Sequence, residues 1–316
     1  MPDKKIIAVV GATGTQGGAL TRAILSEPQG PFAVRALTRN PNSEKAQELK
    51  KLGAEVVTAD IDNLNSLKLA FHGVYGVYCV TFYWDHCMPE REMTQAATMA
   101  QAAKNAGCTH VIWSTLEDTR KVVPLKDTRL PTIMGKYKVP HFDGKGASND
   151  AFRQIGLPTT YLLGSFYWEN LIYMQMGPKR QADGTLVFAL PLGEKRLPGI
   201  AAEDIGKCAF GIFKRGVQFV GKTVGIAGEH LTGKQMAAAL TRALRQRVVY
   251  QHIPFEDYRN LDFPAAKDLA NMFQFQHDFE VDFCAPRNVE QSRSLNPSLL
   301  SFDGWLLKYK NQIPLT

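Results

Sequence analysis

Three glycines near the start of the chain, Gly11, Gly14 and Gly17, are spaced to bind phosphate. They lie in the run AVVGATGTQGGALTRAIL, between a short apolar segment and a segment with apolar residues at helical spacing. In a strand–loop–helix unit the first glycine permits a tight turn and the second lets the backbone approach a pyrophosphate, while the third lets the helix pack closely on the sheet. The N–H groups and dipole of the helix then meet the phosphate charge. Because the pattern sits between a predicted strand and a predicted helix, it indicates a dinucleotide site rather than a structural turn.

The end of the second predicted strand indicates which dinucleotide binds. Sites that prefer NAD usually place an acid there to accept hydrogen bonds from the ribose 2′-hydroxyl. This chain reads LTRNPNSEK, so Arg39 stands where the acid would be, and Ser43 and Lys45 follow it. A guanidinium pairs with a 2′-phosphate that a carboxylate would repel. The sequence therefore predicts NADP(H).

Residues that follow the third and fourth strands are predicted to line the same crevice, because ligands bind at the carboxyl ends of parallel strands. Asp62 and Asn63 are expected near the adenine, and Thr81, Phe82 and Tyr83 along the cofactor. The two aromatic residues could equally be part of a packed loop.

The set of residues that usually transfers a proton in such a fold is incomplete in this chain. The G-x-x-G-x-x-G spacing is typical of short-chain dehydrogenases, which use a Ser and a Tyr-x-x-x-Lys pair to relay a proton. Ser114 ends the fifth predicted strand, but no tyrosine has a lysine four residues later; the run PHFDGKG instead supplies His141 and Lys145. Either His141 replaces the tyrosine as the acid, or the relay is lost and Lys145 remains as a cofactor anchor. We favour the second interpretation.

The elements that must position these residues alternate between strand and helix over the first 160 residues. Such alternation predicts an α/β fold with a doubly wound parallel sheet of Rossmann type. We expect a Rossmann domain over 1–164 and a smaller mixed α/β C-terminal lobe over 165–316, with 201–228 packing back on the Rossmann sheet. Within the lobe, 182–200 resembles a hairpin, and Thr232 with Gln235 has the spacing of a helix capping box.

Composition excludes several classes of function. The chain has 316 residues, a net charge of +7 and five scattered cysteines without C-x-x-C spacing. No disulfide framework, structural zinc site or other metal site is expected, and the cysteine usage fits a reducing compartment. No segment resembles a signal peptide or a membrane span. Direct nucleic-acid binding is not expected, because no recognition element accompanies the positive charge.

Together, VVGATGTQGG, LTRNP, HFDGKG and FYWENL resemble the NmrA-like family of atypical short-chain dehydrogenase-fold proteins, redox-sensing vertebrate members in particular. The resemblance implies NADP(H) binding, a homodimer, and control of regulatory protein partners through the NADPH/NADP⁺ balance. It also implies cofactor contacts from Gly11, Ala12, Thr13, Gly14, Thr15, Gln16, Arg39, Thr81, Phe82, Tyr83, Lys145, Tyr167, Trp168, Glu169 and Asn170. The cysteine usage predicts a location in the cytoplasm, and also the nucleus.

One segment departs from what we expect of the family. Residues 115–140, TLEDTRKVVPLKDTRLPTIMGKYKVP, form a longer connection with six Lys/Arg against three acids. Long loops without regular structure are usually lids, binding loops or disordered. Three hypotheses follow: an NADPH-sensing regulator, a reductase of quinones, aldehydes or imines that uses His141, and, more remotely, a basic regulator that contacts nucleic acid.

Overall fold

The computed structural model describes residues 4–315, and the chain in it forms two units. The first unit contains the chain up to Asp118 together with His141–Gly164 and Glu203–Val224, and the second contains Thr119–Pro140, Ser165–Ala202 and the chain from Gly225 onward. We expect the segment 201–228 to pack on the Rossmann sheet. Its central part, Glu203–Val224, belongs to the first unit, and its two ends belong to the second. The basic connection 119–140, which we had placed in the first domain, groups with the second unit.

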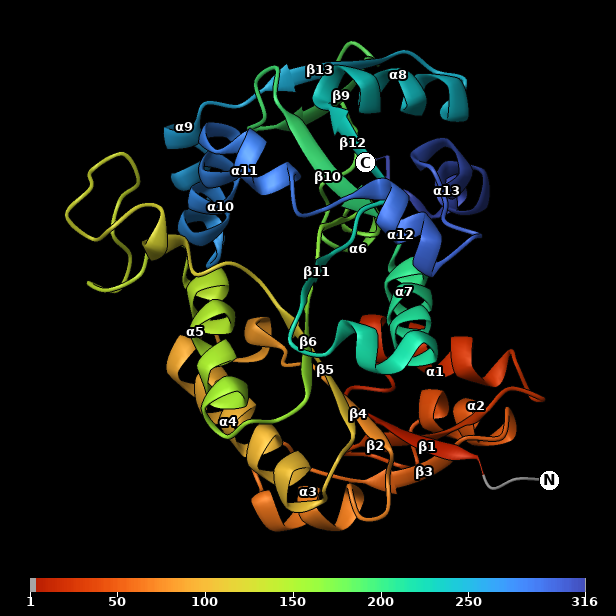
Figure 1. The fold of residues 1–316 in the computed structure, drawn as a ribbon. Coiled ribbons are helices and arrows are strands. Elements are labelled where there is room, and N and C mark those ends of the chain that lie inside the picture. The colour runs from red at the N-terminus through yellow and green to blue at the C-terminus, as the bar shows by residue number, and fades with distance from the viewer. Residues whose placement is uncertain (1–3, 316) are drawn as a thin grey trace. The chain divides into compact units, whose positions relative to one another are not determined.

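A seven-stranded sheet in the order β11-β6-β5-β4-β1-β2-β3 runs through the first unit (Figure 1). Each neighbouring pair from β3 to β6 is parallel. Since chain order reverses between β1 and β4, the sheet is doubly wound with its switch point there, which confirms the predicted fold class. The strands are β1 (Lys5–Val9), β2 (Phe32–Thr38), β3 (Glu55–Thr58), β4 (Gly76–Cys79), β5 (His110–Thr115), β6 (Thr159–Leu163) and β11 (Thr223–Gly225).

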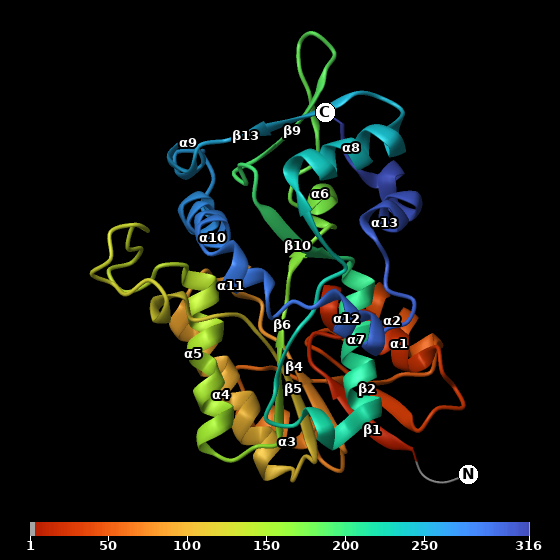
Figure 2. The ribbon, with the colours of Figure 1, turned by 45° about the horizontal axis from the view of Figure 1, so that its top comes forward.

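Helices cover both faces of this sheet (Figures 1 and 2). On one face, α3, α4 and α5 bury a cluster of apolar side chains in which Trp113 stacks on Phe152 at 5.1 Å between ring centroids. On the other face α7 packs on α1 so closely that a Cβ at Gly206 would lie 2.2 Å from the backbone of Ala19 and Leu20. The elements are α1 (Thr15–Leu25), α2 (Glu44–Lys51), α3 (Leu64–Ala70), α4 (Pro89–Asn105), α5 (Pro140–Gln154) and α7 (Ala202–Arg215), with short 3₁₀ turns η1 (Tyr83–Asp85) and η3 (Gly216–Phe219).

Two three-stranded sheets belong to the second unit, in the orders β12-β10-β7 and β13-β9-β8. The predicted hairpin over 182–200 is wrong, because its two strands, β9 and β10, lie in different sheets. The edges of β10 are taken by β12 and β7, and those of β9 by β13 and β8. The strands are β7 (Phe166–Tyr167), β8 (Lys179–Arg180), β9 (Leu186–Leu190), β10 (Arg196–Ile200), β12 (Glu229–Thr232) and β13 (Val248–His252).

The helices of the second unit begin with side-chain caps at several places. Thr232 and Gln235 form the predicted capping box at the start of α8, and Ser301 caps α13. No helix within residues 4–315 has the length and apolar character to span a bilayer. The helices are α6 (Asn170–Tyr173), α8 (Gly233–Leu244), α9 (Phe255–Arg259), α10 (Ala266–Asp278), α11 (Glu280–Cys284), α12 (Val289–Leu295) and α13 (Phe302–Tyr309), with 3₁₀ turns η2 (Thr119–Lys121) and η4 (Lys310–Gln312).

Candidate nucleotide-binding site

The glycine loop between β1 and α1 has the backbone geometry of a phosphate cradle. Gly11 has a φ of +64°, and its carbonyl accepts the N–H of Gly14 at 2.8 Å. A Cβ at Gly17 would lie 2.4 Å from the Gly11 oxygen, so only glycine fits there. The N-cap of α1, Gly14, has no side chain to satisfy the N–H groups of the first turn, and that turn carries no acid. The N-terminus of α1 is therefore suited to an anion.

Arg39 follows β2 and its guanidinium is exposed, with its nearest carboxylate on Asp85 at 3.7 Å. That separation leaves the guanidinium able to turn to a phosphate group, since exposed pairs of this kind contribute little energy. Ser43, predicted beside it, serves as the N-cap of α2: its hydroxyl accepts from the Ala46 N–H and donates to the Asn40 carbonyl.

Asp62 and Asn63, predicted near the adenine, are both engaged within the protein. Asp62 accepts hydrogen bonds from Arg91 at 2.8 Å and Gln95 at 3.0 Å, and the bond from Arg91 in particular lowers the pKa of its carboxyl. The Asn63 side chain accepts the N–H of Ser66 and caps α3. These partners fix the loop after β3 whether or not it contacts a cofactor.

Gln16 joins the glycine loop to two central strands, a connection that the sequence did not reveal. Its Oε1 accepts hydrogen bonds from the hydroxyl of Ser114 on β5, at 2.7 Å, and from that of Tyr78 on β4. Ser114, a candidate for proton transfer, is thus buried with its hydroxyl donated to an amide oxygen.

Lys145 lies in a buried cluster with Thr81 and Glu92, which we call the Lys145 cluster. The Lys145 ammonium is 2.6 Å from Thr81 Oγ1, 3.3 Å from the Thr81 carbonyl oxygen and 2.9 Å from Glu92 Oε1. Thr81 Oγ1 in turn donates to the same Glu92 oxygen at 2.6 Å. Glu92 is fully buried, and its Oε2 has no hydrogen-bond partner among the described residues. The carboxylate therefore sits where it neutralises the ammonium.

The sequence does not identify Glu92 as a site residue. It stands in the first turn of α4, where an acid is common because it interacts favourably with the helix dipole. Only the fold brings it to Lys145 on α5. The four-residue spacing in HFDGKG gave no sign of this partner.

His141 is packed among aromatic rings. Its ring centroid lies 4.8 Å from Trp84, 4.8 Å from Phe142 and 5.8 Å from Tyr83. Tyr83 is buried in this group, whereas its neighbour Phe82 is 65% exposed. The two aromatic residues that we predicted together thus differ: Tyr83 is part of a packed cluster and Phe82 projects from it.

The segment Tyr167–Asn170 lies in the second unit, where its side chains have structural partners. Trp168 is buried against Phe302 and Trp305, with ring centroids 5.3 and 6.3 Å away. Glu169 accepts from the indole N–H of Trp305 through Oε1 and from the backbone N–H of Ala202 through Oε2, both at 2.9 Å. Tyr167 ends β7, and Asn170 begins α6.

The described residues contain no candidate metal site, and the thiols of Cys79 and Cys108 are buried. Among residues 4–315 no group of three or more His, Cys, Asp or Glu side chains could hold a metal ion. Burial raises the pKa of the Cys79 thiol, and it raises that of Cys108 to about 12. Both thiols therefore stay protonated and unreactive near neutral pH.

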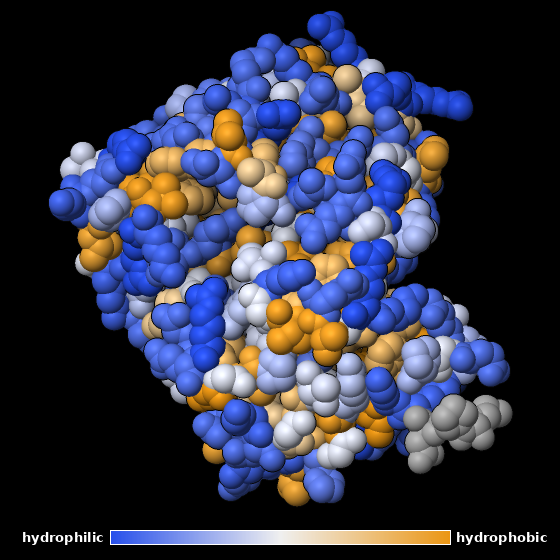
Figure 3. Space-filling model, viewed as in Figure 1, coloured by the Kyte–Doolittle hydropathy of each residue, from blue (hydrophilic) through white to orange (hydrophobic). Residues whose placement is uncertain are grey.

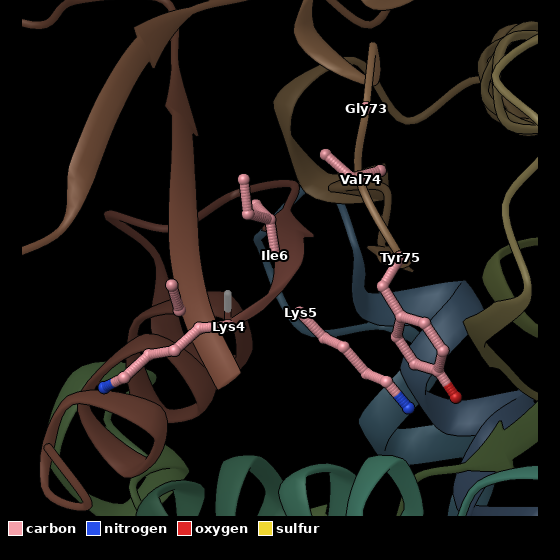
Figure 4. A pocket seen from close by; sticks show the side chains of 7 residues that line it. Lys4, Lys5, Ile6, Gly73, Val74 and Tyr75 are labelled. Atoms are coloured by element: carbon pink, nitrogen blue, oxygen red, sulfur yellow. The ribbon is translucent and has the colours of Figure 1, made fainter. Parts of the chain in front are cut away.

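A shallow cavity of about 620 Å³ lies at the amino end of β1, where Lys4, Lys5 and Tyr75 line it (Figure 4). The Lys5 ammonium lies 4.6 Å from the centre of the Tyr75 ring. Because the glycine loop follows the carboxyl end of β1, this cavity is separate from the candidate nucleotide site.

The strand order and the glycine loop define a nucleotide-binding fold of Rossmann type. The model of the NmrA-like family matches residues 3–306, and the chain belongs to this family, as its sequence motifs predicted. An NmrA-like family domain-containing protein of Dictyostelium discoideum is 30% identical over 275 residues, which are 84% of this chain and 86% of the relative. An NmrA-like oxidoreductase of Aspergillus hancockii is 28% identical over 285 residues, which are 85% of this chain and 82% of the relative.

Solved structures agree with this assignment. NmrA, a negative transcriptional regulator, has been solved in complex with NADP and in complex with NAD. Each structure superposes with a TM-score of 0.77 at 25% identity and covers 96% of this chain and 94% of the NmrA chain.

Proposed function

We propose that this protein is an NADP(H)-binding regulatory protein. It senses the NADPH/NADP⁺ balance, changes conformation or oligomeric state with the bound nucleotide, and thereby controls partner proteins. Nucleotide binding is supported by the loop at Gly11 and by the N-terminus of α1, which is free of a side-chain cap. It is also supported by the NmrA complexes with NADP and NAD. Arg39 favours the phosphorylated nucleotide, because a guanidinium matches the 2′-phosphate.

The observation that carries the regulatory proposal is the pairing of Lys145 with Glu92. In a proton relay the lysine lowers the pKa of the neighbouring acid by its positive charge. Here the ammonium lies 2.9 Å from a fully buried carboxylate, and Thr81 supplies its other two acceptors. Because the charge is compensated within the Lys145 cluster, the arrangement supports a role for the lysine in binding rather than in activating an acid.

The position of His141 supports the same conclusion. Its ring is buried and is surrounded by Trp84, Tyr83 and Phe142. A proton donor must reach a substrate atom directly or through one water molecule. The ring that stands in place of the missing tyrosine packs against aromatic side chains, which supports a structural role for His141 rather than a role as proton donor.

Hydrogen exchange and size-exclusion chromatography at matched saturation with NADPH and with NADP⁺ test this function. We expect the two nucleotides to give different exchange protection in the segment 81–88 or different oligomeric states. Identical protection and identical elution would contradict sensing, even if both nucleotides bind.

The second candidate is an NADPH-dependent reductase of quinones, aldehydes or imines. Several relatives carry the name oxidoreductase, the Aspergillus hancockii protein among them. In this alternative His141, or water, donates the proton that accompanies the hydride. Substrate-dependent loss of NADPH that disappears in His141→Ala would favour it over the regulator.

A further inference from the structure

We propose that residues 119–140, which we call the basic loop, form a preformed docking surface for an acidic segment of a partner protein. The segment would carry apolar side chains among its carboxylates. This proposal rests on the proposed regulatory function, since a protein that acts through partners needs a surface that recognises them.

The basic loop is organised around one buried ammonium. Lys138 is 1% exposed, and its Nζ donates to the carbonyl oxygens of Leu125 at 3.3 Å, Asp127 at 2.6 Å and Leu130 at 2.8 Å, and to Thr132 Oγ1 at 3.1 Å. Burying a charge is unfavourable unless such partners surround it. Lys138 thus joins distant parts of the loop by hydrogen bonds. The regular structure of this loop is limited to the short turn η2 and one bridge between Ile133 and Tyr137.

Side chains of helix α10 donate hydrogen bonds to backbone carbonyls of the basic loop. The Asn271 amide donates to the carbonyl oxygens of Pro131 at 2.8 Å and Lys138 at 2.6 Å. One turn further on, Gln274 donates to the Arg129 carbonyl at 2.9 Å. A loop fixed in this way loses little conformational entropy when a partner binds, which is the advantage of a preorganised surface.

This ordered loop exposes apolar side chains. Val122 is 42% exposed, Leu125 46% and Met134 57%. Met134 has a φ of +52° and is followed by Gly135 at +70°, so two left-handed residues form the tip of the turn and present the methionine there. In Figure 3, apolar residues lie among polar ones at the left, where Figure 1 places the basic loop. Methionine adapts readily to different binding surfaces.

The charge of the loop is strongly one-sided. Within 119–140 six basic residues stand against a single acid, Asp127, and two further acids, Glu117 and Asp118, precede the loop. Asp127 is already bound by Arg129, which holds both of its oxygens and lowers the pKa of the carboxyl to about 2. Lys121, Lys126 and Lys136 are exposed. A partner with carboxylates spaced between apolar side chains complements this surface.

Other occupants fit less well. A second copy of this chain would bring a basic loop against a basic loop. An anionic membrane is typically met by an amphipathic helix with Trp, Phe or Leu on its apolar face, whereas this surface is an irregular loop. Nucleic acid would leave the exposed Val122, Leu125 and Met134 unburied. The observations therefore favour an acidic protein segment.

The test measures fluorescence anisotropy of a labelled synthetic peptide in which glutamates alternate with leucines and phenylalanines, titrated with the full chain. The loop variant is Lys121→Glu/Lys126→Glu/Lys136→Glu. The matched control is Lys68→Glu/Lys104→Glu/Lys179→Glu, which changes the net charge equally at exposed lysines elsewhere. We expect the loop variant to weaken binding about ten-fold or more, because three attractions become repulsions, and the control to weaken it about three-fold at most. Equal losses in both variants, or no binding by the wild-type chain, would overturn the proposal.

Further arms test the apolar contribution and the choice of occupant. Met134→Ser is expected to weaken peptide binding several-fold at constant charge, and a peptide with glutamine in place of glutamate is expected to bind weakly. Phosphatidylserine vesicles and duplex DNA serve as competing probes. If the loop variant lost vesicle or DNA binding while it retained the peptide, the assigned occupant would be wrong.

NADPH affinity measured on the same samples separates this proposal from the function on which it rests. If NADPH binds without turnover and shifts hydrogen exchange, but the basic loop does not select the peptide, only the docking surface fails. If NADPH is consumed with a reducible substrate, the proposed function fails whatever the peptide does.

Discussion

The glycine loop and the Lys145 cluster are built by different means. The loop is a backbone structure: Gly11 turns with a φ of +64°, and Gly17 lets α1 approach β1. The Lys145 cluster consists of buried side chains from the loop after β4, from α4 and from α5. The first retains the geometry of its fold class, while the second has an acid that cancels the charge of its lysine. This difference underlies our proposal that the chain binds the nucleotide without relaying a proton.

Removing the charge of Glu92 from the Lys145 cluster should cause the largest loss in the free energy of unfolding. Glu92→Gln leaves a buried ammonium without its counter-charge, and loss of one partner of a buried ion pair destabilises a protein by about 3–5 kcal/mol. Urea unfolding monitored by circular dichroism measures the change. The double variant Glu92→Gln/Lys145→Met should recover much of the loss, because neither charge remains buried. Additive losses would show that the two side chains do not act as a pair.

A side chain added to the glycine loop should have the second largest effect, on both stability and NADPH binding. A Cβ at Gly17 would lie 2.4 Å from the Gly11 oxygen and 2.6 Å from that of Val10, so Gly17→Ala must displace the loop. We expect a loss of stability of about 3 kcal/mol, the upper part of the range for overpacking, and NADPH binding too weak to measure by calorimetry. Gly18→Ala is the control, because its Cβ would meet nothing closer than 3.1 Å. Equal effects of the two substitutions would contradict the cradle geometry.

Arg39→Ala should affect one nucleotide selectively. The guanidinium is exposed and has a distant carboxylate neighbour, so its removal leaves the fold intact. Calorimetry should show NADPH binding weakened by about 1.5–3 kcal/mol, the range for hydrogen bonds to charged groups, with NADH almost unchanged. A similar loss of binding free energy for NADPH and NADH would show that Arg39 does not bind the 2′-phosphate.

The smallest expected effect is a pH dependence in the basic loop. Arg129 lowers the pKa of Asp127 from 3.8 to about 2. Since the folded pKa lies below the unfolded one, the stabilising contribution is complete above pH 3.8 and is lost as the pH falls toward 2. An NMR titration of the Asp127 carboxyl should show this low value in the wild type and a return toward 3.8 in Arg129→Ala. An unchanged titration in the variant would argue against the contact.

The fold and the glycine loop could be predicted because both depend on local sequence. The alternation of apolar runs and amphipathic segments fixes a parallel sheet, and the spacing of Gly11, Gly14 and Gly17 is a pattern within seven residues. Thr232 and Gln235 likewise formed their capping box from a three-residue spacing.

What could not be predicted depends on contacts between distant residues. Glu92 reaches Lys145 across 53 positions, and Gln16 reaches Ser114 across 98. The hairpin prediction failed for the same reason, because β9 and β10 found partners elsewhere in the chain rather than each other. The order within the basic loop also depends on Asn271, which no local pattern connects to Lys138.

We propose that the chain holds NADP(H) without transferring hydride. The direct measurement is NADPH consumption by the purified protein with a panel of quinones, aldehydes and imines, wild type beside His141→Ala, with NADPH binding measured on the same samples. We expect both proteins to bind NADPH and neither to consume it above the rate without protein. Turnover by the wild type that is lost in His141→Ala would contradict this proposal and would identify a reductase with a rebuilt proton relay.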